Sequence, residues 1–122
     1  MNDPIIGWRC WRFNPATCLL YSVVRQTSWP RFVRLEASEQ PTYDGFLGIH
    51  AWSERRHLDR FIKLESTTIP VWGEVSLWGH VVEHEEGYRA QFAYPFSLLL
   101  LPSDHHHAAA LSGAYGVEAL SL

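Results

Sequence analysis

The stretch from Val71 to Leu101, VWGEVSLWGHVVEHEEGYRAQFAYPFSLLLL, constrains the fold of this chain most strongly. With a period of two residues it divides into two long apolar runs on either side of Glu86-Gly87, which is a turn signal. Alternation with this period is typical of β-strands, and a tight glycine-containing turn between two such runs is typical of a hairpin. We therefore predict that this stretch forms the central hairpin of a sheet.

Shorter alternating runs precede this hairpin. Residues 7–13 alternate and residues 18–24 are β-rich, and the turn residues Asn14-Pro15-Ala16 between these two runs predict a first hairpin. If the chain turns there, Cys10 and Cys18 face each other across it, and we expect both as reduced thiols. The sequence further predicts a polar linker over 26–30, strands over 31–37 and 46–52, and a loop over 39–45.

Two segments have helical signatures. Residues 54–65 follow a potential N-cap, Ser53, and carry apolar residues on one helical face. Ser103 is a potential cap for a second helix through His105 to about Leu111, ended by Ser112-Gly113, and residues 115–117 are predicted to be extended. This order of elements predicts one α+β domain over 1–122. Its curved, mostly antiparallel sheet, or partly open small barrel, carries one packed helix and a C-terminal helix.

The net charge of −3 and the pI near 6.1 disfavour nucleic-acid binding through a bulk electrostatic footprint. A short local groove stays open as an alternative, because five arginines fall in the first third of the chain: Arg9, Arg12, Arg25, Arg31 and Arg34. The first residues lack a secretory signature, and Phe96–Leu101 is much shorter than the ~20 residues of a membrane span. We expect a cytoplasmic protein that does not bind membranes.

Six tryptophans are an unusual number for 122 residues. Tryptophan combines a large apolar ring with one N–H donor, so it suits both a core and a binding surface. The sequence therefore predicts an aromatic ligand or partner surface with polar specificity from nearby arginines and a tyrosine. Its candidate residues are Trp8, Trp11, Trp72, Trp78, Arg9, Arg12, Tyr88 and Arg89.

His80-Val81-Val82-Glu83-His84 matches the H-x-x-E-H pattern of a class of zinc metalloproteases. Zinc binding by this pattern requires a helix, whereas on the predicted strand the two histidines lie about 13 Å apart. We therefore expect no metal and no cofactor. The histidine tract 105–107 likewise indicates adventitious metal affinity only.

Weaker candidates for catalysis are Glu83 or Glu85 as a general base, with His50 or His84 as the acid. His50 also lies at the end of a predicted strand, shortly before a predicted helix N-terminus, where an anion can be received. The structural alternative for the two glutamates is pairing with Arg89 across the hairpin.

Several segments resemble a family of small uncharacterised bacterial proteins: Gly7-Trp8-Arg9-x-Trp11-Arg12, Gly48-Ile49-His50-Ala51, Gly73 to Ala90, Ala93-Tyr94-Pro95 and Tyr115-Gly116-Val117. The resemblance implies a self-contained bacterial domain whose hallmark is the central hairpin, and it implies no activity. Members often carry a Cys, a His and a Cys-x-Cys before the Gly-Ile segment, which resembles a metal site. Ser38, Phe46 and Leu47 occupy that region here, which implies that the site is absent.

Three interpretations of function follow. The first is a small binding module for a small molecule, a nucleotide or a protein, whose aromatic surface recognises the ligand. The second is a small enzyme that acts on a nucleotide or nucleic acid through a Glu/His acid–base pair. The third is a homodimeric scaffold or interaction protein that uses an exposed edge of the central hairpin.

Overall fold

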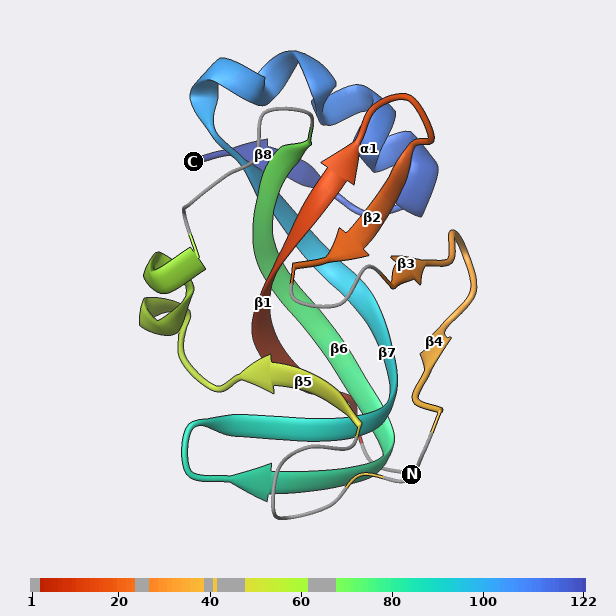
Figure 1. The fold of residues 1–122 in the computed structure, drawn as a ribbon, viewed down its shortest axis with the longest axis vertical. Helices are drawn as coiled ribbons and strands as arrows, with labels where there is room; N and C mark the ends of the chain where they lie inside the picture. Colours follow the sequence, from red (N-terminus) through yellow and green to blue (C-terminus); the bar gives the residue numbers. More distant parts are fainter. Residues whose placement is uncertain (1–2, 24–26, 39–40, 42–47, 62–67) are drawn as a thin grey trace.

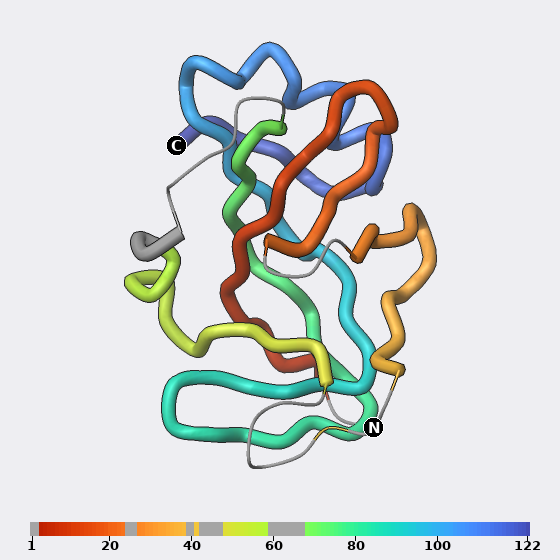
Figure 2. Tube along the Cα trace, viewed as in Figure 1, coloured from red at the N-terminus to blue at the C-terminus, as the bar shows by residue number. Residues whose placement is uncertain are grey.

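The structure, a computed structural model, describes residues 3–23, 27–38, 41, 48–61 and 68–122. Its centre is the predicted hairpin, made of β6 (Ile69–His84) and β7 (Gly87–Leu100), which pair antiparallel along their lengths. The turn consists of Glu85 and Glu86, one residue before the predicted position. Figure 1 shows the long, strongly bent ribbon that results, and Figure 2 shows its turn at one end of the molecule and the C-terminal helical region at the other.

The predicted N-terminal hairpin is confirmed as β1 (Ile5–Asn14) and β2 (Leu19–Ser22). The other edge of β1 pairs with β6 from Ile5 to Phe13. Because Asn14 is opposite Leu19 in the β1–β2 register, Cys10 is not opposite Cys18. Cys10 instead pairs with Trp72 of β6, and Cys18 lies in the turn with φ 56°, so the prediction that the two cysteines face each other is wrong.

Two predictions in the next segment need correction. Ser28–Trp29, predicted as linker, forms β3 and pairs with β2, and the Trp29 ring is fully buried. The strand predicted over 31–37 is limited to β4 (Leu35–Glu36), because Phe32 has φ 61° and interrupts the extended backbone. The predicted loop over 39–45 lies outside the described residues except for position 41.

β5 (Ile49–Trp52) confirms the fourth predicted strand over its described part. It pairs antiparallel with residues 87–90 of β7 and touches β1 through one residue pair, Trp8 and Trp52. The sheet therefore curls back toward β1 without closing into a barrel, and β5 lies alongside the start of β7, next to the hairpin turn (Figure 1).

The helix predicted over 54–65 is a 3₁₀ helix, η1 (Arg55–Phe61), and positions 62–65 lie outside the described residues. Ser53 does not cap it, because its hydroxyl donates a hydrogen bond to the Glu86 carbonyl at 3.1 Å. None of the described helices is long and apolar enough to cross a membrane.

The C-terminal region consists of η2 (Pro102–His107), α1 (Ala108–Tyr115) and β8 (Ala119–Ser121), a strand parallel to β7. The predicted end at Ser112-Gly113 is wrong. The helix ends at Gly116, whose φ of 68° is left-handed and whose N–H donates to the Ser112 carbonyl. A left-handed glycine is a common helix end because it has no Cβ to clash. Tyr115, predicted as extended, is therefore the last helical residue.

The main hydrophobic core lies between the curved sheet and α1. Its largest fully buried side chains include those of Trp11, Trp29, Phe13 and Tyr115. Trp72 and Leu58 are also buried but do not belong to this cluster. The α+β class and the curved, mostly antiparallel sheet are thus as predicted.

Candidate anion site where strands β2 and β5 diverge

β1 changes partners along one of its edges, and Arg9 lies at the point of change. Trp8 pairs with Trp52 of β5, whereas Trp11 pairs with Ser22 of β2. The Arg9 side chain spans the resulting gap. Its Nη1 donates a hydrogen bond to the His50 carbonyl of β5, and its Nη2 donates to the Ser22 hydroxyl of β2 at 2.9 Å.

The aromatic wall beside Arg9 is Trp29. The centre of the Trp29 ring lies 4.9 Å from the Arg9 guanidinium carbon, a distance typical of a cation–π contact. Trp29 Nε1 donates to the same Ser22 hydroxyl at 3.0 Å, so Ser22 joins both side chains. Arg9 is consequently held in one position by β2, β3 and β5.

Among the described residues, Arg9 is a buried cation without an acidic partner. Its pKa is lowered to about 10, mainly by burial; Cys10 opposes this shift, and the charge of Arg89 adds to it. Within the described residues, no carboxylate forms an ion pair with Arg9, and its buried Nε has no hydrogen-bond partner. A buried charge is unfavourable unless an opposite charge or hydrogen bonds compensate it, so this position favours an incoming anion.

Four ring side chains extend from this point along the sheet. His50 and Trp52 share one face of β5, and their rings meet edge-on with centres 4.4 Å apart. His50 also stacks on His84 of β6 at 5.5 Å, and Trp52 stacks on the buried His57 of η1 at 5.0 Å. Register explains this grouping, because β7 lies between β5 and β6 and aligns Gly87 with both Trp52 and His84.

The pKa of His50 reflects its burial and the positive charges around it. Burial and, to a smaller extent, the charges of Arg89, Arg9 and His84 together lower its pKa to about 3. Because all three charge contributions disfavour protonation, the imidazole is neutral near pH 7. The buried Nε2 of His84 has no hydrogen-bond partner within the described part of the chain. We call Arg9, His50, His84 and Arg89 the Arg–His cluster.

The structure brings some predicted ligand-binding residues together and separates others. Arg9 and Arg89 meet in the Arg–His cluster, whereas Arg12 donates from Nη2 to the Val23 carbonyl at 3.2 Å. Tyr88 is half-buried against the core, opposite Glu83. The two arginines at the cluster are therefore the part of the predicted polar set that shares a site.

The predicted tryptophans do not line one surface. Trp11 is buried edge-on against Trp29 with ring centres 5.5 Å apart, and Trp72 is buried elsewhere. Trp8 lies below the Arg55 guanidinium at 5.7 Å, and Trp78 lies beside Phe92 at 6.1 Å. Four of the six tryptophans thus have separate packing environments.

The predicted catalytic residues are only partly grouped. His50 and His84 stack, as described above, but Glu83 and Glu85 are exposed near the hairpin turn. In the register, Glu83 is opposite Tyr88, while Arg89 is opposite Val82 and His50. Neighbouring strand residues point to opposite faces, so Glu83 does not share the face of His84 or of Arg89.

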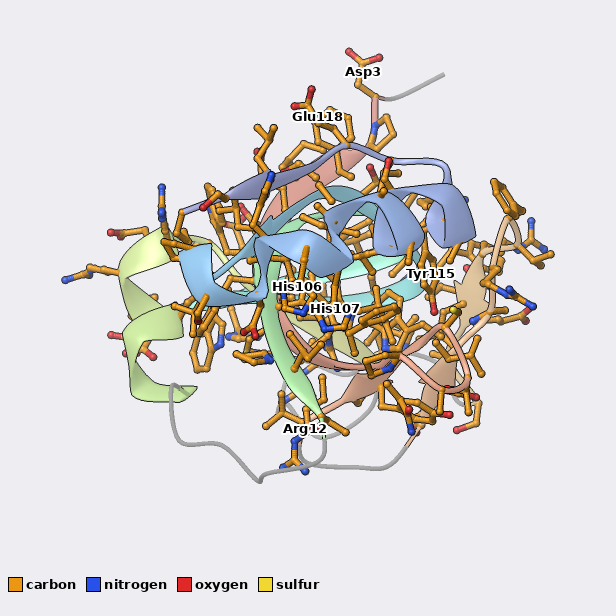
Figure 3. The ribbon with its side chains drawn as sticks, turned by 90° about the horizontal axis from the view of Figure 1, so that it is seen from above. Asp3, Arg12, His106, His107, Tyr115 and Glu118 are labelled. Atoms are coloured by element: carbon orange, nitrogen blue, oxygen red, sulfur yellow. The ribbon has the colours of Figure 1, made fainter. Side chains whose placement is uncertain are left out.

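The H-x-x-E-H segment lies entirely in β6, which confirms the predicted strand. No three or more His, Cys, Asp or Glu side chains in the described ranges are close enough to hold a metal ion. The histidine tract belongs to η2, where the rings of His106 and His107 are 4.0 Å apart and His107 packs against Phe13. Figure 3 shows His106 and His107 close together, with Asp3 and Glu118 at the margin of the view.

Sequence reasoning did not identify Ser22, Trp29, Trp52 or His57. Trp52 could have been found, because it is two residues after His50 on a predicted strand and such residues share a face. Trp29 falls in the predicted linker because Pro30 follows it. Comparisons with family models, with curated proteins and with solved structures find no match for this chain, so the family resemblance stays a prediction.

Proposed function

We propose that this protein is a small binding module that holds the anionic group of a ligand at the Arg–His cluster. The observation that carries the proposal is the Arg9 guanidinium. It is fixed by His50, Ser22 and Trp29, its Nε is buried, and none of its described contacts is a carboxylate. A ligand anion would supply the counter-charge that the described residues do not provide.

The donor chemistry suits a phosphate or a carboxylate. Guanidinium carries five N–H donors, and Arg9 uses one on His50 and one on Ser22, so donors including Nε remain. Hydrogen bonds between charged groups are roughly twice as strong as neutral ones. Neutral His50 and half-buried Trp52 add a polar and an aromatic contact, which favours a ligand with an aromatic part next to its anionic group.

The same observations weigh against acid–base catalysis by the predicted Glu/His pairs. His50 has a pKa of about 3, so it has no proton to give as a general acid near pH 7. Glu83 is exposed and lies on the other face of β6 from His84. Binding therefore accounts for the arrangement better than proton transfer does.

The test is a titration of the intrinsic tryptophan fluorescence with inorganic phosphate and then with AMP, phenyl phosphate and benzoate at low ionic strength. Adenosine serves as the neutral comparison. We expect saturation with at least one anion. Arg9→Gln and Arg89→Gln should each raise the Kd for that anion roughly 10-fold or more, because each removes a charged hydrogen bond.

Arg56→Gln is the matched control, because Arg56 is exposed and outside the cluster. Circular dichroism verifies that each variant is folded, and Arg9→Lys, which keeps the charge, replaces Arg9→Gln if the latter unfolds. No saturable response of the folded protein to any of these anions would overturn the proposal. An equal loss in Arg56→Gln would also overturn it.

A further inference from the structure

A second group of aromatic and cationic side chains lies across β4, β7 and β6, away from the Arg–His cluster. Phe92 of β7 is its centre. Trp78 is opposite Phe92 in the register, with ring centres 6.1 Å apart, and the Arg34 guanidinium carbon lies over the Phe92 ring at 4.0 Å. Arg34 thus covers the Phe92 ring of this pair while remaining exposed to solvent.

The segment just before Arg34 presents an apolar tip. The exposed fractions of Phe32 and Val33 are 68% and 61%, the largest among the exposed large hydrophobic residues of the described chain. Arg31 and Arg34 flank this tip, and both are exposed. Single exposed apolar side chains are common on protein surfaces, but two adjacent ones between two cations indicate an interaction site.

The backbone holds Phe32 in this position. Its φ of 61° is uncommon for a residue with a side chain. Its N–H donates to the Tyr94 hydroxyl at 2.8 Å, and that hydroxyl donates to the Tyr115 carbonyl at 2.8 Å. Gly116 provides the room, because a Cβ there would lie 2.6 Å from Phe32 Cε1. Such conformations persist where surrounding contacts fix them, and they cluster at functional sites.

We propose that Arg31, Phe32, Arg34, Trp78 and Phe92 form a binding surface for single-stranded nucleic acid. Proteins bind unpaired strands by stacking bases on aromatic rings and by placing arginines beside the phosphates. Aromatic rings and arginines alternate on this surface. An acidic protein partner would contact the arginines alone. None of the five residues belongs to the Arg–His cluster, so this inference is independent of the proposed function.

The negative charge of the chain limits the affinity that we expect for a nucleic acid. Glu36 is exposed and opposite Phe92 in the register, and the whole chain carries a net charge of −3. Few phosphates are therefore neutralised, and binding should be weak, with a Kd of about 1 to 100 µM at low salt. A duplex hides the faces of its bases and should bind less well.

The experiment is fluorescence anisotropy of end-labelled dT12 and rU12 oligonucleotides, with a labelled duplex of equal length, at several salt concentrations. Phe32→Gly removes the ring yet suits the positive φ, so the fold is retained. We expect it to weaken binding of the single strands roughly 10-fold, as the loss of one stacked base predicts. Arg34→Gln should lower the log–log salt slope by about 0.7.

Arg56→Gln is the matched control, because Arg56 is exposed in η1 and paired with Glu54. Arg9→Gln, or Arg9→Lys if needed, should leave oligonucleotide binding unchanged, which separates the two proposals. The inference is overturned if neither single strand binds or if the duplex binds as tightly. It is also overturned if Arg56→Gln weakens binding as much as Arg34→Gln, or if a labelled poly-glutamate peptide binds and the oligonucleotides do not.

Discussion

The imidazole rings of His50 and His84 lie nearly parallel, with centres 5.5 Å apart and planes 15° apart, although their strands are separated by β7. Gly87 allows β5 and β7 to approach closely here, because a Cβ at this position would lie 2.1 Å from the Ala51 carbonyl oxygen. The stack therefore depends on three strands and on one glycine. It places two imidazoles beside two guanidinium groups, which determines how the site responds to pH.

His50 should make the protein less stable as the pH falls. Its pKa is about 3 in the folded chain and near its ordinary value of 6.5 in the unfolded chain. Between these values the unfolded chain binds the proton more readily, so stability decreases from pH 6.5 down to about pH 3 and changes little from this cause outside that window. Urea denaturation at pH 7 and pH 4.5 should show a smaller decrease for His50→Asn than for the natural chain.

His105→Gln is the control for this measurement, because His105 is exposed. Phosphate gives a second readout. If an anion binds beside His50, its charge favours the protonated ring, and the NMR titration of the His50 ring should move to higher pH when phosphate is added. An NMR pKa near 6.5 for His50 without phosphate would show that the cationic surroundings are not as described.

Tyr115→Phe should destabilise the protein by about 2 to 4 kcal/mol, because two buried backbone groups would lose their partner. The Tyr115 hydroxyl accepts a hydrogen bond from the Leu20 N–H and donates one to the Trp29 carbonyl, both at 2.7 Å. It thereby joins α1 to β2 and β3. Chemical denaturation monitored by tryptophan fluorescence gives the difference in free energy of unfolding.

Tyr21→Phe is the comparison, because the Tyr21 hydroxyl contacts Thr17 in an exposed position, and we expect a change of about 0.5 kcal/mol or less. Equal losses in the two variants would mean that the Tyr115 hydroxyl does not join the elements. A lower affinity for phosphate in Tyr115→Phe would further indicate that the position of Trp29 matters to Arg9.

The parts of the fold that follow from local pattern were predictable, and those that follow from distant pairing were not. The β6–β7 hairpin has its period and its turn within one stretch. By contrast, Trp29 precedes a proline, which locally favours a linker, yet pairing with Leu20 makes it a buried strand residue. At the site, Arg9 and Arg89 were identified as polar residues. Their meeting depends on the β5–β7 register and on the change of partner along β1, which local patterns do not specify.

Residue type alone likewise does not determine where α1 ends. Gly113 and Gly116 are both acceptable helix ends by residue type, but Gly113 lies inside the helix with open space around its Cα. Gly113→Ala should therefore stabilise the protein by about 0.5 to 1 kcal/mol, because alanine loses less backbone entropy in a helix.

Gly116→Ala should have the opposite sign. Its φ of 68° disfavours any L-residue by about 1 to 2 kcal/mol, and the added methyl would displace the Phe32 ring. Since Phe32 is largely exposed, the ring can move aside, and the strain of the backbone should dominate. Thermal unfolding of the two variants gives the two signs. Because only Gly116→Ala disturbs Phe32, it alone should also weaken oligonucleotide binding, whereas a stabilising Gly116→Ala would contradict the left-handed helix end.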